Sequence, residues 1–429
     1  MSLYREIPAD PSVASFGRLK TEVRHPSGFR PVAGGTVTIR ASGSSQILDI
    51  LETDTSGETA AIDLPAPPVD YSLEPQQEVR PYSTYDLTFE APESESVTVR
   101  GVQIFAGEDA IQEILSTGAT DPDYVSTIPS ASPAEIDIPD NTLWGDFPAK
   151  IPEDEVKPLP ESGEGFVVLN SVVIPQYVVV HNGTPSSSAT DYWIAYADYI
   201  KNVASSEIYS TWPEAALLAN ILAIMSFTLN RVYTEWYRSR GYGFTITSST
   251  AYDQKFSYGR TIYSSISRAV DSVLTNYITR PDILQPLLAQ YCDGRRVTCP
   301  NWLSQWGSKS LADQGYSAIA ILRNYYGYNI YLDTASRISG VPSSYPGSPL
   351  RFGSQGNNVR TIQRQLNRIA RNYPAIPTVT VDGIFGRGTE NAVRRFQSIF
   401  NLTSDGIVGR ATWYKLSQIY TAVTGIAEL

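Results

Sequence analysis

The sequence predicts a multidomain α+β protein: an N-terminal β-sandwich, a mixed α/β central domain around a buried central helix, and a C-terminal three-helix bundle. Three observations support this prediction. Apolar and polar residues alternate with period two over 17–115, an almost wholly apolar helical stretch covers 215–229, and an Asp-Gly-containing octapeptide is repeated near the C-terminus. Alternation with period two is typical of half-buried strands, whereas a helix that is apolar on all sides is buried.

Composition divides the chain of 429 residues into five segments. Pro, Ser, Asp and Glu are concentrated over 116–165, and Ser, Gly, Pro and Tyr over 333–349, which indicates two exposed linkers. The predicted segments are 1–115 (β-sandwich), 116–165 (linker), 166–332 (central domain), 333–349 (linker) and 350–429 (three-helix bundle). Linkers of this composition are preferred sites of proteolysis.

Within the N-terminal segment, strands are predicted where the alternation is clearest, at 17–23, 36–40, 85–89 and 97–104. Turns such as Asp54-Thr-Ser-Gly57 separate them. The order of strands and this turn loosely resemble a carboxypeptidase-regulatory-type sandwich. Such sandwiches rarely catalyse reactions, so we expect no catalytic site in this segment.

The central domain is organised around two predicted helices. Thr211 and Glu214 form a capping box, which predicts a helix that starts near Trp212 and continues through the apolar stretch. A second helical pattern covers 189–206. Glu207 is therefore expected between the two helices, just ahead of a helix N-terminus, where a carboxylate is either a structural cap or a catalytic acid.

The residues around Glu207 resemble a known motif. Val203-Ala-Ser-Ser-Glu207, followed by Trp212-Pro213, is similar to the catalytic stretch of the sporulation protein D family of peptidoglycan lytic transglycosylases. Glu207 takes the position of the catalytic glutamate of that family. Ser304-Gln-Trp-Gly307 is similar to a second family motif, and the resemblance spans about 165–332.

The resemblance implies a reaction that needs a single carboxylate and no cofactor. Glu207 would protonate the leaving glycosidic oxygen and then take the proton of the muramyl 6-hydroxyl, which attacks its own anomeric carbon. Asp253 and Asp271 are possible second carboxylates of an ordinary glycosidase, but no motif links them to Glu207. Burial raises the pKa of such an acid, whereas an adjacent helix N-terminus lowers it, and the sequence leaves this balance open. The candidate substrate-binding residues, each of which is also explained as a core residue, are Tyr252, Gln254, Tyr291, Ser304, Gln305 and Trp306.

This sequence departs from the family pattern in two places. Met225 stands where the family has Arg, and Thr298-Cys-Pro300 where it has Gly-His-Gly, so the roles of that Arg and that His do not transfer. Three states are open for Cys292 and Cys299: a disulfide, two free thiols, or part of a zinc site. Zinc needs four ligands, and the only histidines are His25 and His181. We favour a disulfide or free thiols and expect no metal; His181 is explained more simply as the end of a strand at a turn.

The C-terminal segment contains an internal repeat. Asp382-Gly-Ile-Phe-Gly-Arg-Gly-Thr389 and Asp405-Gly-Ile-Val-Gly-Arg-Ala-Thr412 lie 23 residues apart, and each predicts a turn followed by a helix. An amphipathic helix over 350–366 precedes them. The whole unit is similar to the peptidoglycan-binding three-helix domain of many wall hydrolases. By this resemblance, the residues that characterise the peptidoglycan-binding module are Asp382, Gly383, Gly386, Thr389, Asp405, Gly406, Gly409 and Thr412.

Charge is distributed unevenly along the chain. Residues 1–150 hold 24 acidic and 9 basic residues, a net charge of −15, whereas residues 350–429 carry +6. A basic module suits an anionic polymer, but no basic helix interleaved with aromatic residues indicates nucleic acid as a partner. The N-terminus shows no secretory signal, and the apolar stretch is too short to span a bilayer. We therefore expect a soluble protein without a membrane partner.

The order of these parts resembles the clostridial-type spore cortex-lytic germination enzymes, which are stored as inactive precursors. The resemblance implies a precursor in the spore, at the cortex or the coat–cortex boundary, that cleaves cortex peptidoglycan as a lytic transglycosylase during germination. A subtilisin-like germination protease would activate it by removing the N-terminal region, with a cut expected within 116–150. Two alternatives stay open: a wall-binding structural protein with an inactive catalytic fold, and a phage or bacteriocin lysin.

Overall fold

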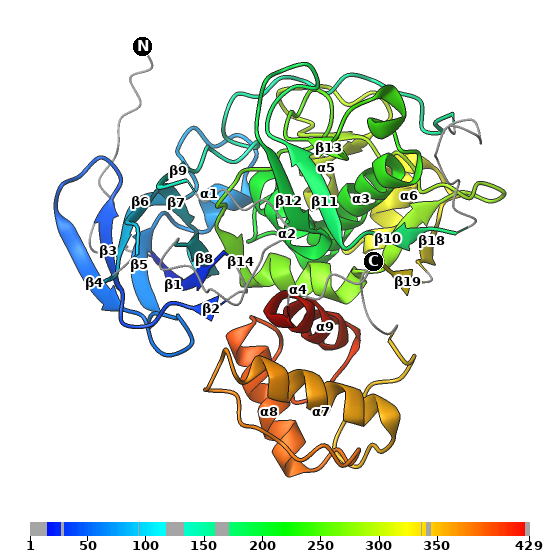
Figure 1. Ribbon diagram of the computed structural model, residues 1–429. Helices are drawn as coiled ribbons and strands as arrows, with labels where there is room; N and C mark the ends of the chain where they lie inside the picture. The colour runs from blue at the N-terminus through cyan, green and yellow to red at the C-terminus, as the bar shows by residue number, and fades with distance from the viewer. Residues whose placement is uncertain are drawn as a thin grey trace.

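The computed structural model describes residues 15–26, 30–92, 94–116, 133–158, 171–335, 337–339 and 345–424. It is a mixed α and β structure. Figure 1 shows the N-terminal strands beside a central helical part, with three C-terminal helices packed below it. Buried apolar side chains from all three parts belong to one continuous cluster.

The N-terminal strands form two five-stranded sheets whose apolar faces meet in this cluster. The first sheet contains β1 (Ser15–His25), β2 (Arg30–Pro31), β5 (Ile62–Ala66), β8 (Asp109–Leu115) and β14 (Ile262–Tyr263). The second contains β3 (Thr36–Ala41), β4 (Ile47–Glu52), β6 (Ser83–Glu90), β7 (Val97–Ile104) and β9 (Glu135–Asp137). In β6 the alternate residues Tyr85, Leu87 and Phe89 are buried, as the period-two pattern predicts. The short helix α1 (Asp70–Leu73) lies between β5 and β6.

One strand of the first sheet comes from the central part of the chain. The two residues of β14 pair with β8 in antiparallel register, Ile262 opposite Ile111 and Tyr263 opposite Ala110. Backbone hydrogen bonds therefore cross from one predicted domain to the next. The N-terminal sheet and the central domain form a shared structure at this edge.

The central domain packs helices and short strand pairs around α3 (Glu214–Tyr233). The other helices are α2 (Tyr196–Glu207), η2 (Arg238–Arg240), α4 (Ser264–Val273), α5 (Gln305–Asp313) and α6 (Ala318–Tyr326). The strands are β10 (Val173–Ile174), β11 (Tyr177–His181), β12 (Asp191–Ala195), β13 (Ile246–Thr247), β15 (Asn276–Thr279), β16 (Tyr291–Cys292), β17 (Leu303–Ser304), β18 (Tyr331–Thr334) and β19 (Arg337–Ile338). Among the described residues, α3 alone is long and apolar enough to cross a membrane, but 83% of its apolar window is buried inside the protein, as in a core helix.

Both predicted helices around Glu207 differ from the structure at their ends. α3 begins at Glu214, and the Thr211 hydroxyl hydrogen-bonds the Ser72 hydroxyl (2.7 Å) instead of capping the helix. The predicted helix over 189–206 begins only at Tyr196, because residues 191–195 form β12, which pairs with β11. Tertiary contacts have thus replaced the local capping and helical pattern.

Residues 133–158, which we name the strap, differ from the predicted exposed linker over 116–165. Asn141, Leu143 and Lys157 are buried in it, and β9 adds to the second N-terminal sheet. The Asn141 amide donates to the carbonyls of Ser205 and Ile208 at the end of α2. Within the range expected for the activating cut, residues 133–150 are therefore packed, while residues 117–132 lie outside the described part of the chain.

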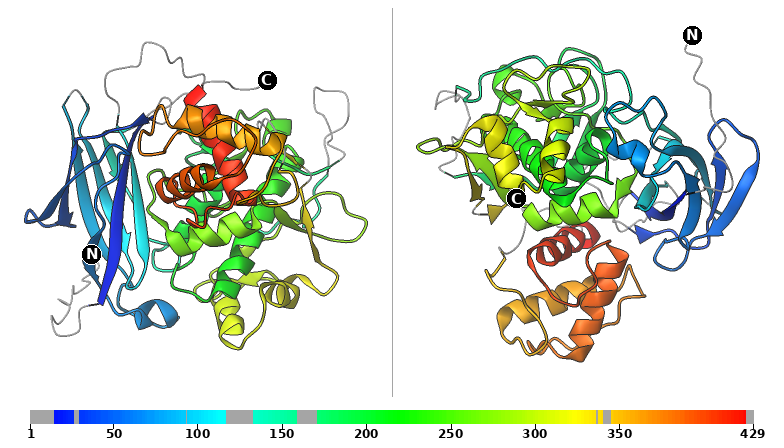
Figure 2. Two further views of the ribbon diagram at one scale, coloured as in Figure 1. Left: turned by 90° about the horizontal axis from the view of Figure 1, so that it is seen from below. Right: turned by 180° about the vertical axis from the view of Figure 1, so that it is seen from behind.

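The C-terminal unit contains α7 (Asn357–Ile369), α8 (Arg387–Ile399) and α9 (Arg410–Thr424). Figure 2 shows it against both other parts. From α9, Lys415 and Gln418 reach Asp198 of α2, at 3.5 and 3.0 Å. The Asn401 side chain donates to buried Glu22 of β1 (2.5 Å) and accepts from Lys20 (2.9 Å). The three parts therefore touch pairwise.

Candidate active site around Glu207

Glu207 is the last residue of α2, and its side chain is only 3% exposed. The Lys255 backbone N–H donates to Oε1 (2.7 Å), and the Tyr291 hydroxyl donates to Oε2 (2.5 Å). The sequence placed this carboxylate just ahead of a helix N-terminus. In the structure it lies instead at the C-terminal end of α2, where the helix dipole disfavours a negative charge.

Burial raises the pKa of Glu207 above its ordinary value. The nearby Lys150 ammonium, the Tyr291 hydroxyl and the Lys255 N–H oppose this shift, because each favours the carboxylate, but they do not cancel it. The helix end acts in the same direction as burial. The balance that the sequence left open therefore raises the pKa, which is the direction that a proton donor to a glycosidic oxygen requires.

Lys150, from the strap, is the cation beside this acid. Burial lowers the pKa of Lys150 to about 8, although Glu207 and Asp253 favour its charged form. Its ammonium donates to the Asp253 backbone carbonyl and lies 5.1 Å from the ring centre of Tyr291. Sequence reasoning missed this residue because the surrounding Pro-rich composition indicated a linker.

Glu207 opens onto a pocket of about 200 Å³. Its walls come from the strap, from the end of α2, from the loop after β16 and from the start of α5. The lining residues are Thr142, Gly145, Asp146, Phe147, Pro148, Ala149, Lys150, Glu207, Thr250, Tyr291, Cys292, Asp293, Arg296, Val297 and Gln305. Strap residues thus make up nearly half of the lining.

The structure brings two of the six candidate substrate-binding residues to this pocket, Tyr291 and Gln305. Gln254 is fully buried away from it, where its amide oxygen accepts from the hydroxyls of Tyr199 and Thr228. Tyr252 is partly exposed and does not line the pocket. A structural role therefore explains Gln254.

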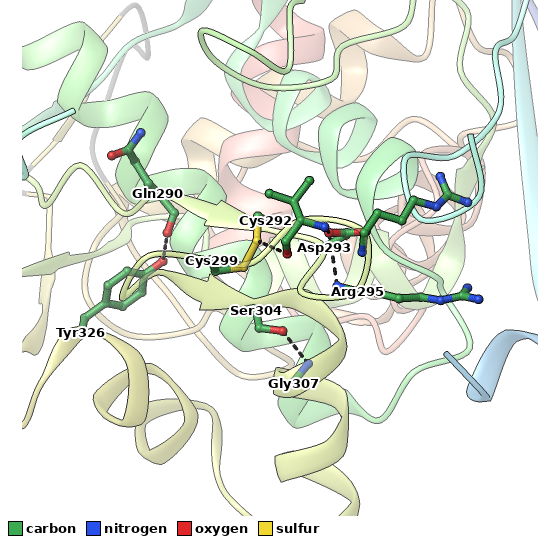
Figure 3. The surroundings of a disulfide bond; sticks show 10 residues. Gln290, Cys292, Asp293, Arg295, Cys299, Ser304, Gly307 and Tyr326 are labelled. Atoms are coloured by element: carbon green, nitrogen blue, oxygen red, sulfur yellow. Dashed lines mark hydrogen bonds between the residues drawn. A yellow bond between two sulfur atoms is a disulfide. The ribbon is translucent and has the colours of Figure 1, made fainter. Parts of the chain in front are cut away.

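Ser304 and Trp306 also have structural roles. The Ser304 hydroxyl accepts from the Gly307 N–H (3.0 Å) and caps α5, as Figure 3 shows. The Trp306 ring packs against Trp212 and Tyr209, at centroid distances of 5.0 and 5.9 Å. Tyr209 and Trp212 belong to the segment that follows Glu207, so the buried Trp306 ring packs directly on this segment.

Neither Asp253 nor Asp271, the two possible second carboxylates, faces Glu207. Asp253 is fully buried and accepts from Arg231 (2.7 Å) and from the Tyr237 hydroxyl (2.6 Å). Asp271 is paired with Lys201 at 2.8 Å. Met225, which replaces the family arginine, is fully buried in α3 and cannot contact a substrate.

Cys292 and Cys299 form a disulfide, with their Cα atoms 5.7 Å apart (Figure 3). It closes the loop in which the Asp293 carboxylate accepts from the backbone N–H groups of Arg296 and Val297. The disulfide therefore fixes one wall of the pocket. Among the described residues, no group of three or more His, Cys, Asp and Glu side chains could hold a metal ion.

His181 ends β11, as expected from the turn that follows it. Its Nδ1 lies 2.7 Å from an Asp191 carboxylate oxygen, and its ring stacks on Phe244. Both contacts are remote from the pocket lining. His181 therefore has a structural explanation.

The repeated octapeptide of the C-terminal unit builds two equivalent turns around buried glutamines. Gln363 of α7 accepts from Gly383 N–H (2.9 Å) and donates to Asp382 (2.9 Å) and Thr389 (3.2 Å). Gln397 of α8 makes the same set of contacts with Gly406, Asp405 and Thr412. Gly386 and Gly409 directly precede α8 and α9. The repeat residues therefore hold the turns in place.

Comparisons with known proteins bear on this C-terminal unit. Residues 355–416 match the family model described as "Putative peptidoglycan binding domain". No curated protein matches the chain.

Three solved structures show local similarity. The SleB N-terminal domain is 32% identical over 18% of this chain and 99% of its own, with a TM-score of 0.16. The 5-hydroxyisourate hydrolase of Klebsiella pneumoniae is 18% identical over 24% of this chain and 92% of its own, with a TM-score of 0.16. A type II cohesin–X-dockerin complex of Acetivibrio cellulolyticus is 14% identical over 24% of this chain and 58% of its own, with a TM-score of 0.15. TM-scores this low carry no argument about the fold of the whole chain. The family match alone assigns residues 355–416 to a peptidoglycan-binding unit.

Proposed function

We propose that this protein is the precursor of a peptidoglycan lytic transglycosylase, with Glu207 as its acid and base. The observation that carries the proposal is a buried glutamate of raised pKa, at the wall of a pocket, in a chain that also contains a peptidoglycan-binding unit. The motif around Glu207 supports the same reaction. Neither Asp253 nor Asp271 is available as the second carboxylate of a hydrolytic mechanism.

In the proposed reaction, protonated Glu207 gives its proton to the glycosidic oxygen as the bond to the anomeric carbon breaks. The resulting carboxylate accepts the proton of the muramyl 6-hydroxyl, whose oxygen forms the new bond to that carbon. No water is consumed, and Glu207 ends protonated, as it began. The Lys255 N–H holds Oε1, and the Tyr291 hydroxyl stabilises the carboxylate at Oε2 between the two steps.

We further propose that the substrate is spore cortex peptidoglycan and that the protein is stored in the spore until a subtilisin-like germination protease cuts it. The order of the parts supports this biological setting through the family resemblance. Residues before Thr142 do not line the pocket, whereas seven residues between 142 and 150 do. Removal of the chain up to residue 141 is therefore compatible with keeping Glu207 and the pocket lining.

The test is mass spectrometry of the muropeptides that protease-activated protein releases from cortex fragments. Wild type should release anhydro-muropeptides, and Glu207→Gln should bind the same fragments but release none. The matched control is Glu214→Gln, because Glu214 is exposed at the start of α3. Product release by Glu207→Gln at the wild-type level would overturn the assignment, and reducing-end products from wild type would indicate hydrolysis.

A further inference from the structure

Residues 142–150 of the strap lie along the pocket that contains Glu207. Six consecutive residues, 145 to 150, line it. The space that remains, about 200 Å³, is below the roughly 300 Å³ at which ligand pockets begin. A glycan strand has at least two sugar rings at the bond that is cleaved. Displacement of residues 145–150 would therefore widen the groove for such a strand.

Specific contacts hold the strap just before this segment and within it. Asn141, just before it, binds the end of α2. Within it, Arg296 donates to the carbonyls of Trp144 and Gly145, and the Thr250 hydroxyl donates to the Pro148 carbonyl (3.0 Å). These contacts hold the turn at 142–145 and the irregular stretch 146–150 against the central domain.

Further contacts anchor the last part of the strap. Glu153 forms an ion pair with buried Arg231, and Gln290 exchanges hydrogen bonds with the backbone of Ile151 and Glu153. Gln285 makes the same exchange with Lys157, donating to its carbonyl at 3.0 Å. The anchoring groups are side chains of the central domain, whereas the strap contributes mostly backbone.

Lys150 supplies the charge that matches the acid. Lys150 and Glu207 both line the pocket, and the ammonium, 5.1 Å from the ring centre of Tyr291, favours the Glu207 carboxylate electrostatically. Glycosidic cleavage passes through an oxocarbenium-like state with a positive charge next to the same carboxyl group. The Lys150 cation therefore takes the place that positive charge of the substrate would occupy.

We propose that residues 142–150 occupy the glycan-binding groove of the protein, with Lys150 against Glu207, and that a glycan strand binds only after this segment is displaced. This proposal rests on the proposed function. It assigns the inhibitory contact to the strap, while the N-terminal sheets serve as its anchor through β9.

The experiment uses the full chain with a site-specific protease sequence placed within 159–170, between the strap and β10. Product release from cortex fragments and amide hydrogen exchange of residues 142–158 are measured on the same samples. The uncut chain should release only a low basal amount of product and keep the strap protected. After the cut, product should appear while the strap loses protection.

Lys150→Glu tests the contact itself, because it places a second carboxylate beside Glu207. In the uncut chain it should speed exchange of the strap and raise product release at least about tenfold over uncut wild type. Asp154→Asn, in an exposed part of the strap, is the control and should change neither. Product release with a fully protected strap, or loss of activity in cut Lys150→Met to the Glu207→Gln level, would overturn the proposal.

Failure of the proposed function is recognised separately. If no form releases product, the cut chain is mixed with chitotetraose, a soluble oligomer of N-acetylglucosamine. Loss of protection at residues 142–158 on adding chitotetraose supports displacement of the strap by glycan even without catalysis. Unchanged protection rejects it.

Discussion

At the scale of single residues, the two oxygens of Glu207 are held differently. Oε1 faces a backbone N–H, which mutation of a side chain does not remove, whereas Oε2 faces the Tyr291 hydroxyl. The Tyr291 bond favours the carboxylate and so lowers the pKa of Glu207, against the larger effect of burial. Burial and the neighbouring carboxylate in turn raise the pKa of Tyr291 well above its ordinary value, so its hydroxyl remains a donor.

This arrangement predicts the effect of Tyr291→Phe on the pH profile. Without the hydroxyl, the carboxylate loses a donor, so the pKa of Glu207 rises further. In the proposed reaction Glu207 starts protonated, so activity should fall as pH rises through its pKa. The alkaline limb should therefore move to higher pH by about one unit or less. The measurement is the rate of product release between pH 4 and 9, with Tyr252→Phe as control; a shift to lower pH would contradict the assignment.

At the scale of elements, the two turns of the C-terminal unit depend on Gln363 and Gln397. The Gln397 amide is buried and serves Gly406, Asp405, Thr412 and the carbonyl of Ile407 at once. Gly406 and Thr412 are buried, so water cannot replace the glutamine at these two groups. One glutamine therefore positions the start of α9 relative to α8.

Gln397→Leu should lower the free energy of unfolding of the C-terminal unit by about 3 kcal/mol, because it leaves several buried polar groups without a partner. Thermal unfolding of the variant, followed by circular dichroism, measures the loss. Gln355→Leu, at an exposed position just before α7, is the matched control and should change the midpoint little. Equal midpoints for both variants would show that the turn does not need the glutamine.

A second prediction at this scale concerns the junction of β8 with α4. Burial raises the pKa of Glu108, just before β8, to about 7, and the Ser265 hydroxyl donates to its carboxyl group (2.6 Å). The folded protein thus keeps this proton up to about pH 7, whereas the unfolded chain releases it near 4.5. The free energy of unfolding should therefore fall as pH rises through this window, by up to about 3 kcal/mol.

Urea unfolding at pH 5, 6, 7 and 8 measures this slope. Glu108→Gln should remove the Glu108 contribution, because an amide cannot ionise. Asp109→Asn, at an exposed neighbouring carboxylate, should keep the slope. An unchanged slope in Glu108→Gln would mean that other groups account for the pH dependence.

The sequence predicted the elements that carry a periodic pattern of apolar residues of their own. Alternation gave the inward residues of β6, and the apolar run gave α3, because a strand or helix that packs on a core repeats its apolar positions at its own period. It could not predict β14, whose two residues carry no period. It also could not predict the strap, since a Pro-rich segment that packs as an extended peptide has the same composition as an exposed linker.

The same limit explains the candidate site. Glu207 and Tyr291 lie on elements of the central domain with recognisable patterns, and both reach the pocket. Lys150 arrives from the strap, so no spacing in the sequence joins it to Glu207. Gln254 and Trp306 were expected at the substrate for their chemical type. In the structure, the Tyr199 hydroxyl donates to Gln254, and the Trp212 ring packs on Trp306. Residue type alone did not distinguish a side chain that reaches the pocket from one that is enclosed in the core.

At the scale of the whole molecule, an ion-pair network on β1 lies where the N-terminal and C-terminal parts touch. Glu22 is buried between Lys20 (2.9 Å) and Arg24 (2.6 Å), and Asn401 of the C-terminal unit donates to it. Arg24 also lies over the Phe400 ring, 5.3 Å from its centre. A network of buried ion pairs tolerates the loss of one member poorly. This contact therefore fixes the wall-binding unit relative to the rest of the chain.

The C-terminal unit should anchor the protein to the wall. Residues 345–429 alone should bind insoluble peptidoglycan, and binding should weaken between about 50 and 500 mM salt, because screening reduces the attraction of a basic unit to an anionic polymer. Sedimentation of protein with wall fragments measures both effects. The chain without this unit should stay in the supernatant; if it sediments as well as the full chain, the anchor lies elsewhere.

The shared sheet edge at β14 also constrains how the protein is made. β8 ends at residue 115, but its antiparallel partner is translated almost 150 residues later, at residues 262–263. At common elongation rates this is a delay of roughly 7–30 s. During that time the nascent chain presents the open edge of β8 to the cytosol, where it can pair with another chain. Synthesis of the central domain is thus what protects the N-terminal sheet from aggregation, and chaperones that cover strand edges on the ribosome should matter most while residues 116–261 are being translated.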